Sequence, residues 1–321
     1  MQSAPRALIV SPQKTGTHLI QELMLELGYK IVGATRPSER NTPVFDDEQR
    51  RAIARLVFSE ADYRAVLETT GEEFRRRTDE AWTVLCWSWY RRFGQPVANR
   101  YGQNRYDYVD VAGSNPALSS TRFDDTPEGL CWMWHDLDIS KVDGSFIGEW
   151  CDTGRPPVIL NHRDPRDALV SLINFVEGKT PKGFGNFYER RVFNAVLRAK
   201  STMSEKIDYA LRDPYFLAST EFEKSLWLLH HPGVCKVSYE ELVGPEGGGS
   251  KERQVAAVER VLAHVGAKEA DAEQIADRIY NTDSWSFHTG RTGGWRKAFS
   301  EANTKLFNER YGDILEQYGY E

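Results

Sequence analysis

Four residues near the start of the chain, Lys14-Thr15-Gly16-Thr17, have the composition of an anion-binding turn. They lie between an apolar run and an amphipathic run that begins at His18. A turn from a strand into a helix directs backbone N–H groups at one place, and the positive end of the helix dipole attracts an anion. Because a lysine cation stands beside those N–H groups, the turn predicts a site for phosphate or sulfate.

The order of these residues differs from that of the common triphosphate-binding loop. In that loop, G-x-x-x-x-G-K-[ST], the lysine follows the last glycine, whereas here Lys14 precedes Gly16. A chance match in a surface turn is the alternative. Leu19 and Leu23 begin an apolar pattern with helical spacing, and Gly28 follows it as a stop signal. This pattern favours a turn that opens a helix.

A second strand-to-helix signal occurs in the middle of the chain. Asp164 stands as a helix N-cap with Pro165 at the first helical position, which is a strong start signal. Arg163 precedes this start and Ser171 follows two turns later. The two side chains could clamp a second phosphate by charge-assisted hydrogen bonds. The alternative is a local ion pair between Arg163 and Asp167, with Ser171 as a small packing residue.

These segments resemble, in the same order, motifs of the sulfotransferases that use 3′-phosphoadenosine 5′-phosphosulfate (PAPS). Residues 12–17 resemble the 5′-phosphosulfate loop, and residues 163–171 resemble the 3′-phosphate motif, including the eight-residue step from arginine to serine. Residues 237–242 are similar to a strand-turn segment of the family, and residues 287–297 to its glycine-rich loop that closes over the cofactor. The similarity continues through Phe299, Phe307 and Tyr311. Four ordered matches thus span nearly the whole chain.

The resemblance implies a single α/β domain over residues 1–321, with a P-loop-NTPase-like central parallel sheet flanked by helices. Residues of about 36–129 form a longer, aromatic and arginine-rich connection than the cytosolic members have, and resemble a helical acceptor-binding insertion or lid. An ordinary helical subdomain with its own small core is the alternative, because aromatic residues at helical spacing are usually packing residues.

The implied reaction transfers the sulfuryl group of PAPS to a hydroxyl, or as a second choice an amine, of a small-molecule acceptor. The product is 3′,5′-adenosine diphosphate (PAP), and no metal is required. We expect Lys14 to stabilise the leaving oxygen and His135 to act as general base. Asp136, Asp138 and Glu149 are the alternative bases. The expected cofactor-binding residues are Lys14, Thr15, Gly16, Thr17, His18, Arg163, Ser171, Tyr239, Arg291, Thr292 and Gly293.

The chain departs from the family pattern at three places. Gln13 stands before the lysine where the family usually has proline, and Leu19 replaces an aromatic residue that often stacks on adenine. The alternative stacking candidates are Trp82, Trp87, Trp89 and Trp285, each of which is also a candidate core residue. Residues 288–289 replace a cationic pair, so Arg291 or Arg296 would contact the 3′-phosphate.

The sequence predicts strands at 7–10, 157–160 and 234–238, and the resemblance implies a further strand that ends within residues 132–137. It predicts helices at 18–27, 165–176, 189–211, 220–230, 252–265, 270–280 and 303–318. Alternating strands and helices indicate a parallel sheet covered by helices, with ligands at the carboxyl ends of the strands. Both anion-binding segments would lie at that edge.

Composition limits the partners and the compartment. The net charge of −6 provides no general surface for nucleic acid or an anionic membrane. The four cysteines show no C-x-x-C spacing, which fits reduced thiols better than a disulfide framework or a zinc site. Neither a secretory signal nor an apolar run of bilayer-spanning length is visible. We therefore expect a cytoplasmic protein without a membrane span, and a homo-oligomer is compatible with the sequence.

Two other classes of function remain open. One is a P-loop-type small-molecule kinase or nucleotide hydrolase, and the other is a nucleotide-binding module without catalysis. The position of Lys14 before the glycine, and the absence of an adjacent Mg²⁺-binding carboxylate signature, argue against the kinase. A non-catalytic module would bind PAP but transfer no sulfate.

Overall fold

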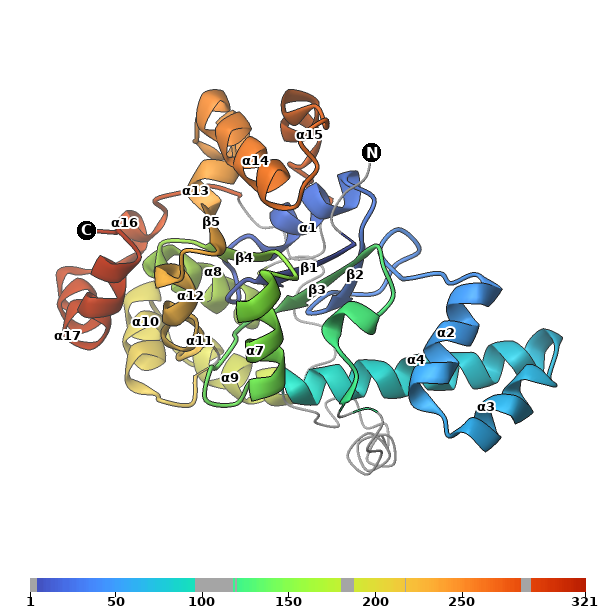
Figure 1. Ribbon diagram of the computed structural model, residues 1–321. Coiled ribbons are helices and arrows are strands. Elements are labelled where there is room, and N and C mark those ends of the chain that lie inside the picture. Colours follow the sequence, from blue (N-terminus) through green and yellow to red (C-terminus); the bar gives the residue numbers. More distant parts are fainter. Residues whose placement is uncertain (1–4, 96–117, 119, 180–187, 217, 284–289) are drawn as a thin grey trace.

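The computed structural model describes residues 5–95, 118, 120–179, 188–216, 218–283 and 290–321. Its centre is a five-stranded parallel sheet with the strand order β2-β3-β1-β4-β5 (Figure 1). The strands are β1 (Arg6–Val10), β2 (Lys30–Gly33), β3 (Leu130–Trp134), β4 (Val158–His162) and β5 (Val234–Ser238). The predicted fold class, a parallel sheet flanked by helices, is confirmed.

The helices alternate with these strands along the chain. They are α1 (Thr17–Glu26), α2 (Asp47–Val57), α3 (Glu60–Leu67), α4 (Gly71–Arg92), α7 (Gly144–Thr153), α8 (Pro165–Glu177), α9 (Tyr188–Arg198), α10 (Met203–Arg212), α11 (Glu221–Lys224), α12 (Leu226–His230), α13 (Tyr239–Leu242), α14 (Lys251–His264), α15 (Ala272–Arg278), α16 (Trp295–Ala298) and α17 (Glu301–Gln317). Short 3₁₀ turns occur at η1 (Phe123–Asp125) and η2 (Pro245–Gly247).

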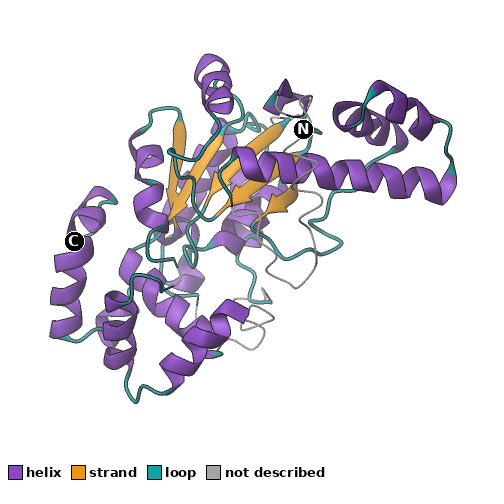
Figure 2. Ribbon diagram, turned by 90° about the horizontal axis from the view of Figure 1, so that it is seen from below, coloured by secondary structure: helices purple, strands orange, loops and turns teal. Residues whose placement is uncertain are grey.

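Both faces of the sheet are covered, as expected for parallel strands that read as continuous apolar runs. Every residue of β1 is buried. Ala7 and Ile9 pack with α1, α14 and α15 on one face, whereas Leu8 and Val10 pack with α4, α7 and α12 on the other. Figures 1 and 2 show the sheet between these two helical layers. The carboxyl ends of the strands thus emerge from a firmly packed base.

A third apolar cluster joins α8, α9, α10 and α17, the group at the left of Figure 1. Leu172 of α8, Leu211 of α10 and Phe307 of α17 are among its buried residues. Because α8 starts directly after β4, this cluster supports the second predicted anion-binding segment.

The described part of the 36–129 insertion is helical and consists mainly of α2, α3 and α4, which extend to the right in Figure 1. Its aromatic residues join the main core rather than a separate one. Trp89 is fully buried, and its ring meets Phe123 edge-on with centroids 5.0 Å apart. Residues 96–117 and 119 lie outside the described residues, and acceptor binding by this insertion stays a prediction.

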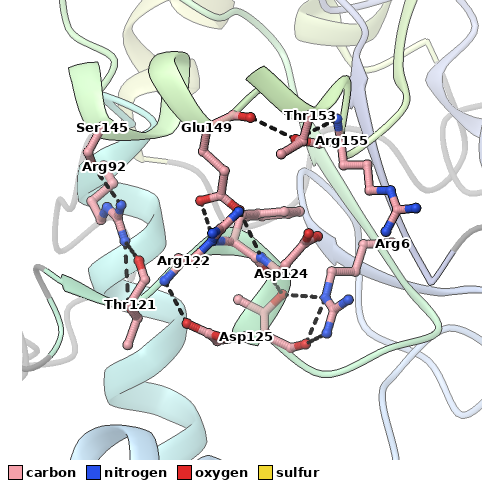
Figure 3. A network of polar contacts seen from close by, with 12 residues as sticks. Arg6, Arg92, Thr121, Arg122, Asp124, Asp125, Ser145, Glu149, Thr153 and Arg155 are labelled. Atoms are coloured by element: carbon pink, nitrogen blue, oxygen red, sulfur yellow. Dashed lines mark hydrogen bonds and ion pairs between the residues drawn. The ribbon is translucent and has the colours of Figure 1, made fainter. Parts of the chain in front are cut away.

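A polar network ties the end of this insertion to the amino-terminal edge of the sheet (Figure 3). Arg6, the first residue of β1, donates from Nε to the Thr126 carbonyl oxygen over 2.7 Å. Glu149 of α7 accepts the backbone N–H groups of Phe123 at 3.0 Å and Asp124 at 3.3 Å. This network therefore lies at the edge opposite to the carboxyl ends of the strands.

The predicted elements are present, with several differences. The predicted helix at 220–230 is two short helices, α11 and α12, with Ser225 between them. The predicted helix at 189–211 is two helices, because Thr202 accepts the Glu205 backbone N–H in a capping box that starts α10. The short strand β2 was not predicted, since its four residues carry too little pattern. Among the helices that the structure describes, none is long and apolar enough to cross a bilayer.

Candidate functional site

The turn after β1 holds Lys14 in a strained conformation. The Thr15 backbone N–H donates to the Pro12 carbonyl oxygen over 3.1 Å and closes a four-residue turn. Lys14, its third residue, has a φ of 68°, the left-handed value that favours glycine at this place in a type II turn. A non-glycine residue there costs about 1–2 kcal/mol. The surrounding contacts must therefore hold the turn in place.

Hydroxyl groups brace this turn from the inside. Ser11 Oγ lies 3.0 Å from Thr15 Oγ1 and 2.9 Å from Thr17 Oγ1. Asn161 of β4 donates from Nδ2 to Ser11 Oγ over 2.9 Å and to the Thr15 carbonyl oxygen over 3.0 Å. The Thr15 and Thr17 hydroxyls thus lie in an internal network. The N–H groups at the start of α1 are the natural donors to an anion.

Gly16 allows Tyr239 to pack against the turn. Gly16 has a φ of 91°, and a Cβ atom at this position would lie 2.4 Å from the Tyr239 ring. That buried ring also contacts the Arg163 guanidinium, which lies 4.2 Å from the ring centroid. Only glycine satisfies both the backbone angle and the close approach. The sequence-predicted residues Gly16, Tyr239 and Arg163 are therefore in contact.

Arg163 joins segments that are far apart in the sequence. Its Nη1 donates to the Lys14 carbonyl oxygen over 3.3 Å, and its Nη2 donates to the Arg291 carbonyl oxygen over 2.7 Å. The Asp167 carboxylate lies 3.5 Å from the same guanidinium, so the local ion pair considered from the sequence is present. Arg163 is 8% exposed, and its Nε has no hydrogen-bond acceptor among the described residues. A buried, unsatisfied guanidinium N–H suits an anionic oxygen.

The glycine-rich segment near the C-terminus is anchored to the start of α8. The Asp167 carboxylate accepts the Gly293 N–H at 2.6 Å and the Trp295 N–H at 2.7 Å. The Arg166 guanidinium lies 3.7 Å from the Trp295 ring centroid. Thr292 donates its N–H to the Gly247 carbonyl oxygen over 3.2 Å. Arg291 is exposed beside this anchor, whereas residues 287–289 of the predicted motif lie outside the described residues.

Ser171 lies on the face of α8 that points to the turn. Asp167, Ser171 and Phe175 follow each other at four-residue intervals and so form one stripe along the helix. Asp167 contacts Arg163, and the Lys14 Nζ lies 4.5 Å from the Phe175 ring centroid. The partly exposed Ser171 is therefore between the contacts of the two cationic residues.

The electrostatics of the turn favour an anionic ligand. Loss of hydration, and then the positive charges of Arg163 and Arg190, lower the pKa of Lys14 to about 7. Loss of hydration and the Lys14 charge lower the pKa of His18 to about 4, and His135 contributes in the same direction. Lys14, His18 and His135 thus share one region with an excess of positive charge.

His135 follows β3 and has the tautomer that a general base needs. Its Nδ1 lies 3.0 Å from the Ser11 carbonyl oxygen. A carbonyl oxygen can only accept, so Nδ1 carries the proton and the lone pair of the neutral ring is on Nε2. The backbone of the anion-binding turn thereby orients the imidazole.

The three alternative carboxylates are less suited to this role. Asp136 pairs with Lys224 over 3.1 Å. Asp138 accepts the Ser140 hydroxyl at 2.6 Å, and this bond lowers its pKa. Glu149 belongs to the network at the amino-terminal edge (Figure 3), separated from the carboxyl edge by the length of β1, about 13 Å at 3.3 Å per residue. Glu149 as the base is therefore wrong.

Two residues at the turn were missed by the sequence reasoning. Glu221 of α11 accepts the Gln13 backbone N–H at Oε2 over 2.5 Å and the Gln13 side-chain Nε2 at Oε1 over 2.6 Å. Arg190 of α9 donates to Gln13 Oε1 over 3.4 Å. The departure from the family pattern at Gln13 was the signal that this position has a partner of its own.

An apolar cavity borders Gln13. It is lined by Gln13, Leu169, Leu172, Ala210, Phe222 and Tyr311 among others. Its lining residues on α8 lie about 120° around the helix from the Asp167–Phe175 stripe, at 100° per residue. The cavity thus adjoins the turn but differs from the polar face described above.

Of the tryptophans considered as an adenine platform, Trp89 is excluded because it is fully buried in the core. Trp82 packs between Phe45 and Trp132. Trp285 lies outside the described residues. No group of three or more His, Cys, Asp or Glu residues that could hold a metal occurs in the described ranges.

Comparisons with known proteins were made for the sequence and for the fold. No protein-family model matches the chain, and no curated protein sequence matches it. Among solved structures, the chain is similar to mouse sulfotransferase SULT7A1 complexed with PAP, with 13% identity, a TM-score of 0.48, and coverage of 97% of this chain and 84% of that chain. It is also similar to retinol dehydratase in complex with androsterone and inactive cofactor PAP, with 18% identity, a TM-score of 0.45, and coverage of 98% and 82%.

Proposed function

We propose that this protein is a PAPS-dependent sulfotransferase that sulfates a hydroxyl, or as a second choice an amine, of a small-molecule acceptor. The contact between Arg163 and the backbone of Lys14 carries the proposal. Residues 149 positions apart, each expected to bind one of the two anionic groups of the donor, meet in one place. The third motif, at Arg291, reaches the same guanidinium.

The residues present fit such a donor. The unsatisfied Nε of Arg163 and the partly exposed Ser171 provide donors for one phosphate, and the N–H groups that open α1 provide donors for the other. PAPS supplies a sulfuryl group on a reactive anhydride oxygen. Lys14 then counters the negative charge that develops on the leaving oxygen, a role worth on the order of several kcal/mol in such sites.

His135 takes the proton of the acceptor in this proposal. Its Nδ1–H is held by the Ser11 carbonyl oxygen, which directs the lone pair of Nε2 away from the turn backbone. The cavity beside Gln13 receives the apolar part of the acceptor, because its lining is almost wholly apolar. All four cysteines are free thiols, which suits the cytoplasm as the working compartment.

A ligand panel and a transfer assay test the proposal. PAP should raise the melting temperature more than 5′-AMP does, because 5′-AMP lacks the 3′-phosphate, and more than ATP with Mg²⁺. Incubation with labelled PAPS and hydroxylated metabolites should yield products heavier by one sulfate. Preferential stabilisation by ATP with Mg²⁺ would favour the kinase class instead. Binding of PAP without transfer to any acceptor would indicate a binding module.

A further inference from the structure

Glu221 is a buried carboxylate placed against the anion-binding turn. It is 7% exposed, and both of its oxygens accept from Gln13, one from the backbone N–H and one from the side-chain amide. Charged groups are rarely buried without such partners. A carboxylate that receives two N–H donors from one residue fixes that residue in one orientation.

Gln13 is the residue that immediately precedes the strained Lys14. It is the second residue of the turn closed by Thr15, and Lys14 is the third. The left-handed φ of Lys14 costs free energy that other contacts must offset. The clamp on Gln13 acts on the neighbouring peptide unit, so it opposes relaxation of Lys14 to an ordinary φ.

The short helix α11 contacts both sides of the proposed reaction centre. Glu221 holds the residue before Lys14, and Lys224 pairs with Asp136, the residue after His135, over 3.1 Å. The helix is itself anchored, because Tyr318 donates its hydroxyl to the Phe222 carbonyl oxygen over 3.0 Å. The positions of both proposed catalytic side chains thus depend on one four-residue element.

From this geometry we propose that Glu221 is a positioning residue, which holds Lys14 in its strained turn by accepting both N–H donors of Gln13. The inference rests on the proposed function only where turnover is measured. The clamp itself is a property of the folded chain and is tested without any reaction.

The ionisation of Glu221 gives the clamp a signature in pH. Loss of hydration raises the pKa of Glu221 to about 7, Asp136 adds to the rise, and the Gln13 hydrogen bonds and Lys224 oppose it. Arg190 faces the same site from α9 through Gln13. Above pH 7 the carboxylate accepts both donors, and below it the bound proton removes one acceptor site. The turn is therefore clamped most firmly on the alkaline side.

The experiment compares Glu221→Gln with Glu223→Gln, a matched control at an exposed glutamate of the same helix. A glutamine at 221 has a single acceptor oxygen, so one donor of Gln13 loses its partner. We expect at least a tenfold lower kcat for Glu221→Gln, with the KM of the acceptor and the affinity for PAP changed less than threefold. The control should match the parent enzyme.

Two further readouts separate positioning from general damage. The kcat of the parent should fall about tenfold as the pH drops through about 7, because protonated Glu221 loses one acceptor site, and this step should be absent from Glu221→Gln, which lacks that site at every pH. In a double-mutant cycle, Gln13→Ala and Glu221→Gln should be less than additive, since Gln13→Ala removes the side-chain donor to Glu221 and leaves only the backbone N–H of residue 13.

A spectroscopic readout requires no activity. The Gln13 backbone amide resonance should titrate with a midpoint near pH 7 in the parent and in Glu223→Gln, and should not titrate there in Glu221→Gln. A Gln13 amide resonance that is the same in Glu221→Gln as in the parent would overturn the proposal, as would a kcat for Glu221→Gln equal to that of the control. If the parent transfers no sulfate at all, the proposed function fails, and the comparison of the amide resonances still decides whether Glu221 holds Gln13.

Discussion

Replacing Gly16 with alanine tests the packing of the anion-binding turn. The added Cβ must adopt a φ of 91° and would lie 2.4 Å from the Tyr239 ring. Left-handed backbone costs an alanine about 1–2 kcal/mol. Tyr239 is buried and lies against Arg163, so its ring has little freedom to move, and overpacking of this kind adds about 1–3 kcal/mol. We expect a loss of about 2–5 kcal/mol in the free energy of unfolding.

Gly28→Ala is the matched control for this change. Gly28 has a similar φ of 85°, and nothing lies within 4 Å of the position of its Cβ. This variant should therefore show only the backbone cost, about 1–2 kcal/mol. With an unfolding entropy of about 2.1 cal/mol/K per residue, each kcal/mol lowers the melting temperature by about 1.5 °C. Gly16→Ala should then lose about 3–8 °C, and Gly28→Ala about 1.5–3 °C.

The assay combines denaturation with calorimetry of PAP binding. Gly16→Ala should weaken PAP binding at least tenfold because the turn must open, while Gly28→Ala should bind PAP like the parent. In a Tyr239→Ala background the cost of Gly16→Ala should fall to that of Gly28→Ala, since the clash is gone. If the two glycine variants lose equal stability in the parent, or if Tyr239→Ala relieves nothing, the reasoning about close packing is refuted.

Four further predictions concern the proposed chemistry. Lys14→Ala should lower kcat at least 10³-fold. The pKa of Lys14 is lowered to about 7 in the protein without ligand, so an anion that raises this pKa should cause proton uptake when PAP binds at pH 8. Calorimetry in two buffers of different ionisation enthalpy measures this uptake, and equal uptake by Lys14→Ala would contradict the assignment. His135→Ala should lower kcat by about 10²–10⁴-fold, and a fully active variant would return the base role to Asp136 or Asp138. Arg163→Ala should abolish the preference for PAP over 5′-AMP in a binding assay, whereas a parent that binds both equally would rule out Arg163 as the contact for the 3′-phosphate. Ala210→Leu should raise the KM of apolar acceptors without changing PAP affinity, and unchanged KM values would exclude the cavity as the acceptor site.

Local signals in the sequence were sufficient to predict where most of the helices begin and end. Asp164 caps α8 with Pro165 at its first position, as predicted, and α1 ends before Gly28. These features depend on residues within one or two turns of each other. The break between α9 and α10 carried such a signal as well, the capping box from Thr202 to Glu205, which the apolar periodicity of the longer run obscured.

The insertion shows where local signals are insufficient. Its aromatic residues repeat with helical spacing, which is equally compatible with a ligand surface and with a core. Trp89 enters the core beside Phe123 because the C-terminal part of α4 lies across the face of the sheet. Nothing within the helix specifies this partner, so the pattern alone could not decide between the two interpretations.

The chain's own order of residues determined the chemistry available to this protein: a lysine and glycine at a strand-to-helix turn, an arginine at a second such turn, and a histidine after a third strand. Only the tertiary structure decided that Arg163 reaches Lys14, that Nδ1 of His135 donates to Ser11, and that Glu221 clamps Gln13. The physical reason is the separation of the partners. Contacts across 149, 124 and 208 positions depend on the order in which strands pair and helices pack, which no short window of sequence contains.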